Sequence, residues 1–125
     1  MMLGIDHIVL TVADLDRTLE FYARVLGMTV RREKDRPAAL LFGSQKINVH
    51  DQAQPFEPKA LRPTAGSADF CLATDRPLQE WLDHLERHGV AVEFGPVERA
   101  GARGKMQSIY FRDPDFNLIE MSKYD

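Results

Sequence analysis

The chain has 125 residues, 44% of them hydrophobic and 28% charged, as expected for one compact domain. A net charge of −3 leaves no basic excess to neutralise phosphates, so we expect no nucleic-acid partner. The single cysteine, Cys71, excludes an internal disulfide. No apolar run is long enough to cross a membrane, and the N-terminus lacks a signal-peptide pattern. We therefore expect a cytoplasmic protein without membrane attachment.

The first half of the chain predicts a strand, a helix and three further strands. Asp14 can cap the helix, because its carboxylate can accept hydrogen bonds from the free backbone N–H groups of the first turn. Apolar residues then recur at helical spacing until Gly27, which suits the left-handed position that ends a helix. The predicted strands span residues 6–12, 28–33, 38–42 and 46–50.

The second half repeats this order after a proline-rich connector. Asp75 is the predicted helix cap, Pro77 suits the first helical turn, and Gly89 ends the apolar stripe. The predicted strands span residues 68–74, 90–94, 106–112 and 117–123. Asp113 opens the turn before the last of these strands.

The element order β-α-β-β-β therefore occurs twice, which predicts an α+β fold. We expect residues 1–125 to form a single domain with modules at about 4–51 and 67–125, joined by a linker at 52–66. Each module would place its helix outside a curved, cupped sheet. When the two halves are aligned, His7 matches Asp69, and Asn48 matches Glu120.

Four predicted strands carry an apolar face and, opposite it, side chains that can bind a metal. Side chains alternate along a strand, so His7, Asp69 and Glu120 each lie opposite the apolar face of their own strand. Asn48 and His50 do so on a fourth strand. Imidazole and carboxylate groups are ligands for divalent metals, although a polar face can also simply be hydrated.

The chain resembles the vicinal oxygen chelate superfamily, which includes glyoxalase I, bleomycin- and fosfomycin-resistance proteins and extradiol dioxygenases. The resemblance rests on DHIVLTVADLDRTLEFYARVLGM (residues 6–28) and YFRDPDFNLIEMS (residues 110–122). It is closest to the glyoxalase domain-containing protein 5 subgroup, through FGSQKINVH (42–50), FEPKALRPTAGSADFCL (56–72) and GPVERAGARGKMQSIYFRDPD (95–115).

The resemblance implies a divalent ion, Fe²⁺, Mn²⁺, Ni²⁺ or Zn²⁺, held by the first and last strands of each module. The matching positions are His7, Asn48 or His50, Asp69 and Glu120. Family enzymes usually carry histidine where this chain has Asp69, and the amide of Asn48 is a weak ligand. Relatives form dimers whose modules complete each cup, so the resemblance also implies a homodimer.

The resemblance favours a metalloenzyme in which Glu120 acts as general base on a small substrate chelated through adjacent oxygens. Either lyase or isomerase chemistry, as in lactoylglutathione lyase, or ring-cleaving dioxygenation at His7, His50 and Glu120 would fit. Arg103 and Lys105, in a glycine-rich segment, could close over an anionic substrate, or the segment could be an ordinary hairpin loop. The rival interpretation is a non-catalytic small-molecule-binding or drug-resistance protein, which Asn48 and Asp69 favour.

Overall fold

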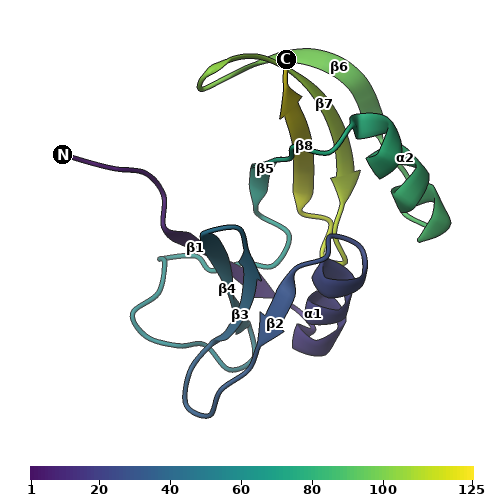
Figure 1. Cartoon of the computed structure of the whole chain (residues 1–125). Helices are drawn as coiled ribbons and strands as arrows, with labels where there is room; N and C mark the ends of the chain where they lie inside the picture. Colours follow the sequence, from purple (N-terminus) through teal and green to yellow (C-terminus); the bar gives the residue numbers. More distant parts are fainter. The chain divides into compact units, whose positions relative to one another are not determined.

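The computed structural model describes all 125 residues and divides the chain into two compact units, residues 1–67 and 68–125. Each unit contains one four-stranded mixed sheet and one helix (Figure 1). The predicted α+β class and the repeated β-α-β-β-β order are confirmed.

The first unit orders its strands β1-β4-β3-β2, with β1 and β4 parallel and the other pairs antiparallel. Its elements are β1 (His7–Val12), α1 (Leu15–Arg24), β2 (Thr29–Arg31), β3 (Ala38–Phe42) and β4 (Gln45–Asp51). Asp14 caps α1 as predicted, because its carboxylate accepts a hydrogen bond from the Arg17 N–H at 3.1 Å. No helix or strand forms between β4 and β5.

Burial in the first unit follows the alternation of side chains along the strands. The buried side chains of β1, β3 and β4 on the apolar face are Leu10, Val12, Ala38, Leu40, Ile47 and Val49. Helix α1 contributes Leu19 and Tyr22 to the same core. Full burial of a large aliphatic side chain stabilises a fold by about 1.5–3 kcal/mol, so this face holds the sheet and helix together.

The second unit has the same arrangement, with strand order β5-β8-β7-β6 and a parallel β5–β8 pair. Its elements are β5 (Asp69–Ala73), α2 (Leu78–Arg87), β6 (Phe94–Gly101), β7 (Gly104–Arg112) and β8 (Leu118–Tyr124). The predicted cap of α2 is wrong. Asp75 is not the N-cap, because α2 begins three residues later, at Leu78. The N-cap is Pro77, and the helix has no side-chain cap bond.

Strand β6 differs most from the sequence prediction. A strand was expected at residues 90–94, whereas β6 begins at Phe94 and pairs with β7 as far as Gly101. Gly95 and Pro96 lie at a register irregularity on this edge strand, where proline is tolerated because no further strand needs an N–H donor from it.

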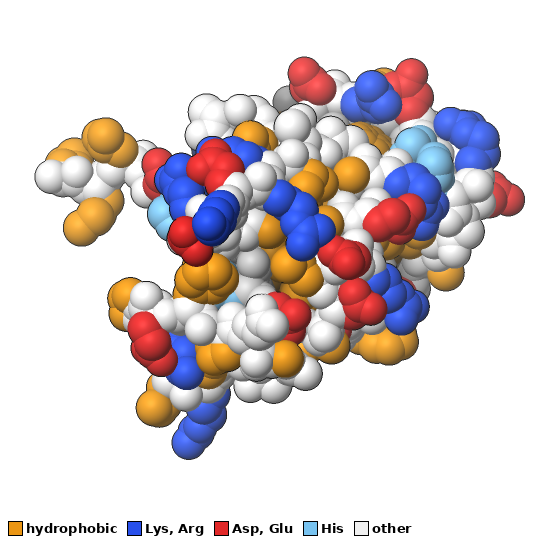
Figure 2. Space-filling view, turned by 90° about the horizontal axis from the view of Figure 1, so that it is seen from below, with side chains coloured by type: hydrophobic (Ala, Val, Ile, Leu, Met, Phe, Trp, Pro, Cys, Tyr) orange, Lys and Arg blue, Asp and Glu red, His pale blue; other side chains and the backbone are white.

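Positive and negative side chains are interspersed on the face of the molecule shown in Figure 2. Exposed groups of the chain form several ion pairs, such as Arg32 with Asp16 at 2.7 Å and Arg36 with Glu33 at 2.7 Å. Such exposed pairs contribute little to stability. No helix in the structure is both long and apolar enough to pass through a membrane.

Candidate functional site

The sheet of the second unit has one polar face, and Glu120 lies near its middle. Glu120 of β8 is opposite Cys71 of β5 on one side and Tyr110 of β7 on the other. One step along the strands, Ser122 is opposite Ser108. Residues opposite each other in a sheet point to the same face, so these side chains form one surface.

Two buried hydroxyls hold the Glu120 carboxylate by one of its oxygens. Ser108 Oγ donates to Glu120 Oε2 at 2.7 Å, and Ser122 Oγ lies 3.2 Å from the same oxygen. The two hydroxyl oxygens are themselves 2.6 Å apart, and both serines are fully buried. Both bonds go to Oε2, so Oε1 remains available to a ligand.

The thiol of Cys71 joins this network from β5. Its Sγ lies 3.1 Å from Ser122 Oγ. Burial raises the pKa of Cys71 above its ordinary value, the Ser122 hydrogen bond partly opposes that rise, and the nearby charge of Glu120 adds to it. A protonated thiol is a poor nucleophile, so this environment does not activate Cys71.

Asp69 lies on the same face as Glu120, at the start of β5. Its register partner is Leu118, two positions before Glu120. Two residues of a strand span about 7 Å, a separation that two carboxylates on neighbouring strands can bridge through one bound ion.

A neighbouring carboxylate orients His7 at the start of β1. The Nδ1 atom of His7 lies 2.8 Å from Asp6 Oδ1, an exposed carboxylate. With Nδ1 engaged, the lone pair of Nε2 is the one available to a metal. This carboxylate–imidazole arrangement is common beside metal-bound histidines.

His50 does not share the position of His7. The parallel register pairs His7 with Lys46 and His50 with Thr11, so four residues separate the two histidines along the strands. That separation is about 13 Å, too long for both rings of one chain to ligate a single ion.

The connector after β4 covers His50. His50 as a whole is 8% exposed, and its ring lies 5.3 Å, centroid to centroid, from the ring of Phe56. Burial lowers the pKa of His50 below its ordinary value. The position in the first sheet that is equivalent to Glu120 is occupied by Asn48 and not by His50. Asn48 pairs with Val9 of β1 in the same way that Glu120 pairs with Cys71 of β5.

The imidazole of His7 in the first unit, and the carboxylates of Asp69 and Glu120 in the second, are donor groups of the kinds that bind divalent metals. No group of three or more His, Cys, Asp or Glu side chains that could hold a metal ion is found. His7 Nε2 and Glu120 Oε1 are the donor atoms that existing hydrogen bonds leave available.

The two predicted anion-binding residues, Arg103 and Lys105, lie in different parts of the second unit. Arg103 lies in the β6–β7 turn, with its guanidinium 4.3 Å above the Tyr124 ring, and lines an open pocket with Asp75 and Lys123. Lys105 lies on the face opposite Glu120, because it is adjacent to Met106 on β7. Its Nζ is 3.4 Å from Asp125 and 3.8 Å from Glu98, so carboxylates partly balance its charge.

The predicted site lacked the partners of Glu120, which are Ser108, Ser122 and Tyr110. All three belong to predicted strands, and their alternation places Ser108 and Tyr110 together on one face of β7. The missing information was the register between β7 and β8, which brings the serines onto the carboxylate.

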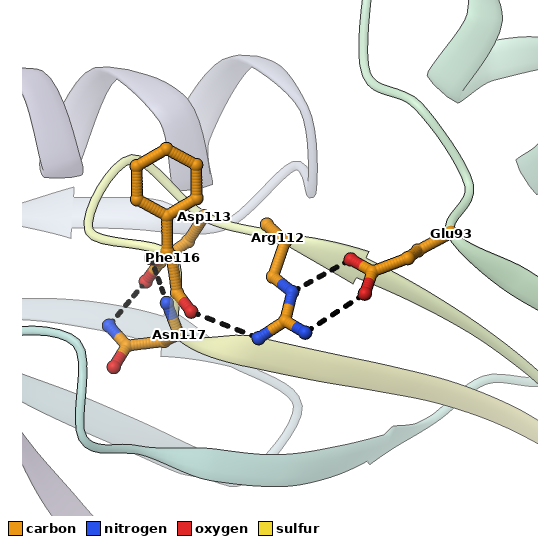
Figure 3. A network of polar contacts seen from close by, with 5 residues as sticks. All are labelled: Glu93, Arg112, Asp113, Phe116 and Asn117. Carbon is orange, nitrogen blue, oxygen red and sulfur yellow. Dashed lines mark hydrogen bonds and ion pairs between the residues drawn. The ribbon is translucent and has the colours of Figure 1, made fainter.

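A hydrogen-bonded turn precedes β8, the strand that carries Glu120 (Figure 3). The Asp113 carboxylate accepts bonds from the Asn117 N–H at 3.0 Å and from Asn117 Nδ2 at 2.8 Å. Asn117 Oδ1 in turn accepts the Ala68 N–H at 2.9 Å, which ties the start of β5 to β8. Arg112 binds both oxygens of Glu93 and the Phe116 carbonyl.

The duplicated fold and the polar sheet faces place the protein among glyoxalase-type proteins. The family model described as glyoxalase/bleomycin resistance protein/dioxygenase superfamily matches residues 4–121. The chain therefore belongs to this superfamily.

Several relatives match over nearly the whole chain. The virulence protein STM3117 of Salmonella typhimurium is 52% identical, with 96% of this chain and 83% of that protein covered. Its crystal structure superposes with a TM-score of 0.97 at 50% identity, covering 100% of this chain and 99% of the other. The glyoxalase domain-containing protein RDO1 of Mycosarcoma maydis is 50% identical, with 97% and 68% covered.

A more distant relative carries the name of an enzyme. The lactoylglutathione lyase GLX1 of Arabidopsis thaliana is 31% identical over 91% of this chain. The match covers 43% of the length of that protein.

Proposed function

We propose that the protein is a divalent-metal-dependent enzyme acting on a small substrate that binds through adjacent oxygens. The observation that carries this proposal is the Glu120 carboxylate, held through Oε2 by Ser108 and Ser122 and open at Oε1. The two hydroxyls lock the position of this carboxylate on the polar face of the sheet, as a binding or catalytic role requires.

His7 and Asp69 complete the proposed ligand set with Glu120. Asp6 supports His7, since its bond to Nδ1 orients the ring and leaves Nε2 as the nitrogen available to a metal. A bound Fe²⁺, Mn²⁺, Ni²⁺ or Zn²⁺ ion would act as a Lewis acid that stabilises negative charge on substrate oxygens.

In this proposal Glu120 also serves as general base for a proton on the carbon beside a substrate carbonyl. The serine hydroxyls fix the position of the carboxylate that would accept this proton. This assignment favours lyase or isomerase chemistry of the lactoylglutathione lyase type. Ring-cleaving dioxygenation through His50 is less favoured, because the register keeps His50 away from His7.

We further propose that residues 1–125 act as one domain, that the chain belongs to the glyoxalase domain-containing protein 5 subgroup, and that it works as a cytoplasmic homodimer. The subgroup assignment rests on the three sequence runs quoted above. The homodimer is proposed because the chain belongs to a superfamily whose members often form dimers.

Metal analysis of protein purified without a histidine tag tests the proposal. We expect bound metal in the wild type and its loss in His7→Ala and in Glu120→Gln, which removes the charge but keeps the side-chain shape. Asp6→Ala should weaken metal binding by about 10–100-fold, as expected when the carboxylate behind a ligating histidine is lost.

Two control variants make the result specific. His88→Ala removes a histidine from the end of α2, and Asp16→Ala removes an exposed carboxylate from α1. Both should keep the metal. Unchanged metal content in both His7→Ala and Glu120→Gln would contradict the proposal. Turnover of the methylglyoxal–glutathione adduct, compared with that of catechols, then separates the two reaction classes.

A second candidate is a binding or drug-resistance protein without catalysis. Asn48 favours it, because the sheet position equivalent to Glu120 carries an amide, which is a poor metal ligand. A protein that binds small ligands equally well with and without added metal, and turns none of them over, would support this candidate.

A further inference from the structure

We propose that Arg99 recognises a carboxylate or similar anionic group on the substrate. The inference rests on the proposed function, since it places a specificity-determining residue beside the Glu120 site. The expected substrate is a small anion that also carries two adjacent oxygens.

Arg99 lies on the same face of the second unit as Glu120. Arg99 pairs with Met106 of β7. The Val97–Ser108 pair lies two residues away along the same two strands. Ser108 is the residue that donates to Glu120. Because side chains two apart on a strand share a face, Arg99, Ser108 and Glu120 belong to one surface.

Two aromatic rings and one hydroxyl hold the Arg99 guanidinium in place. Arg99 Nε donates to Tyr110 Oη at 2.9 Å. The guanidinium carbon lies 5.5 Å from the ring centroids of both Phe94 and Tyr110, within the range of cation–π attraction. A guanidinium positioned in this way loses little conformational entropy when it binds an anion.

No carboxylate balances the charge of Arg99. Its other recorded bond runs from Nη1 to the Glu98 carbonyl at 3.2 Å, which leaves Nη2 for a ligand. Arg112 and Lys105 of the adjacent strand β7 differ, since Arg112 grips both oxygens of Glu93 and Lys105 lies near Asp125. Planar guanidinium groups bind carboxylates strongly, so Arg99 is suited to an external anion.

The Arg99 side chain reaches back toward Glu120 by way of Tyr110. The backbone of Arg99 lies two strands from Glu120, but its Nε donates to Tyr110 Oη, and Tyr110 is directly opposite Glu120 across β7 and β8. A substrate that spans the Tyr110 side chain can therefore reach both groups. Its adjacent oxygens would face Glu120 and its anionic group would face Arg99.

A purely structural role for Arg99 is the competing explanation. Charged residues on edge strands discourage pairing with other chains, and cation–π contacts add some stability. Such a role would change stability without changing the choice between ligands. The test therefore needs two probes that differ only in an anionic group.

Catechol and protocatechuate form that pair, because both present adjacent oxygens and only protocatechuate carries a carboxylate. Titration calorimetry of the full chain supplemented with Mn²⁺ would give both affinities for the wild type and for Arg99→Gln. We expect wild-type protein to prefer protocatechuate by about tenfold or more, the effect of a charge-assisted hydrogen-bonded pair. Arg99→Gln should lose this preference and keep its affinity for catechol.

Two further variants complete the design. Arg99→Lys should recover part of the preference, because it restores the charge without the planar fork. Arg87→Gln removes an exposed cation at the end of α2 and should leave the preference intact.

The outcomes separate the inference from the proposed function. A preference that survives in Arg99→Gln, or an equal loss of both affinities together with lowered stability, overturns the inference and leaves the metal-enzyme proposal standing. Failure of the Mn²⁺-supplemented wild type to bind either probe contradicts the proposed function and, with it, the inference.

Discussion

His50 illustrates how a local contact changes the meaning of a residue. Its strand position made it a candidate ligand, but the connector places Phe56 against its ring and leaves it 8% exposed. A buried imidazole is more easily kept neutral, which is why the pKa of His50 falls. The burial of His50 therefore favours a packing role over a role as metal ligand.

The lowered pKa of His50 predicts a pH-dependent stability. Below about pH 6.5 the unfolded chain takes up a proton at His50 before the folded chain does. Stability should therefore fall as the pH drops from about 6.5 and level off below the folded-state pKa. His50→Gln should show a flatter profile in urea unfolding between about pH 7 and 5.

His84→Gln, which removes a histidine from α2, is the control for this experiment. It isolates the effect of burial at His50 from the loss of a histidine as such. Identical profiles for the wild type and His50→Gln would show that burial does not control the protonation of this residue.

Asn117 is a second residue whose role depends on its partners. It is 1% exposed and bonds both to Asp113 and to the Ala68 N–H. Asn117→Ala should lower the free energy of unfolding by about 1–3 kcal/mol, because it leaves buried groups without partners.

Arg112→Gln, in the same turn, provides the comparison. It breaks an ion pair with Glu93 in which both side chains are exposed. Solvent and salt screen such pairs, so we expect a smaller loss than for Asn117→Ala in the same denaturant titration. The reverse order would mean that the ion pair, and not the buried amide, holds this turn.

Strand β6 was the element that the sequence predicted least well. Its residues include Gly95 and Pro96, which have low strand propensity. The strand forms nevertheless, because β7 offers it a row of backbone donors and acceptors across the hairpin. Strand propensity describes one segment, whereas this pairing depends on two.

Gly95 allows β6 to approach β7 closely. A Cβ at this position would lie 2.4 Å from the Ser108 carbonyl oxygen, and φ is +101°. Gly95→Ala should therefore be destabilising both by backbone strain, about 1–3 kcal/mol, and by a clash with backbone. Thermal unfolding of the full chain would measure the loss.

Gly104→Ala separates these two contributions. Gly104 also has a positive φ, +128°, but a Cβ there would meet nothing within 4 Å. We expect it to be less destabilising than Gly95→Ala. Equal losses would mean that strain alone, without the close approach of the strands, determines the effect.

In the proposed homodimer, the His7 and Glu120 that form one metal site belong either to one chain or to two. Mixed dimers of His7→Ala and Glu120→Ala chains distinguish these cases. If each site combines residues from both chains, a mixed dimer contains one intact site and recovers about half of the metal that two intact sites bind. If each site lies within one chain, no site is intact.

Co-expression with two different purification tags would isolate the mixed dimer, and metal analysis would report the outcome. Mixed dimers of wild-type and His7→Ala chains serve as the reference for one intact site, since they retain one site in either arrangement. A purely monomeric protein would contradict the proposed homodimer.

The element order, the fold class and the faces of the strands could be predicted because they depend on neighbours in the chain. Side-chain alternation placed Asp69 and Glu120 opposite the apolar face, and a cap and a glycine bounded α1. The internal alignment of His7 with Asp69, and of Asn48 with Glu120, also agrees with the strand registers of the two sheets.

Only the tertiary structure decided which residues meet across the strands. Register is a property of two segments, and a shift of one residue would turn every side chain to the other face. The strand register brought Ser108 and Ser122 to Glu120 and separated His50 from His7. It also placed Arg99 over Tyr110. The sequence by itself thus determined the candidate ligands, whereas the pairing of strands decided their partners.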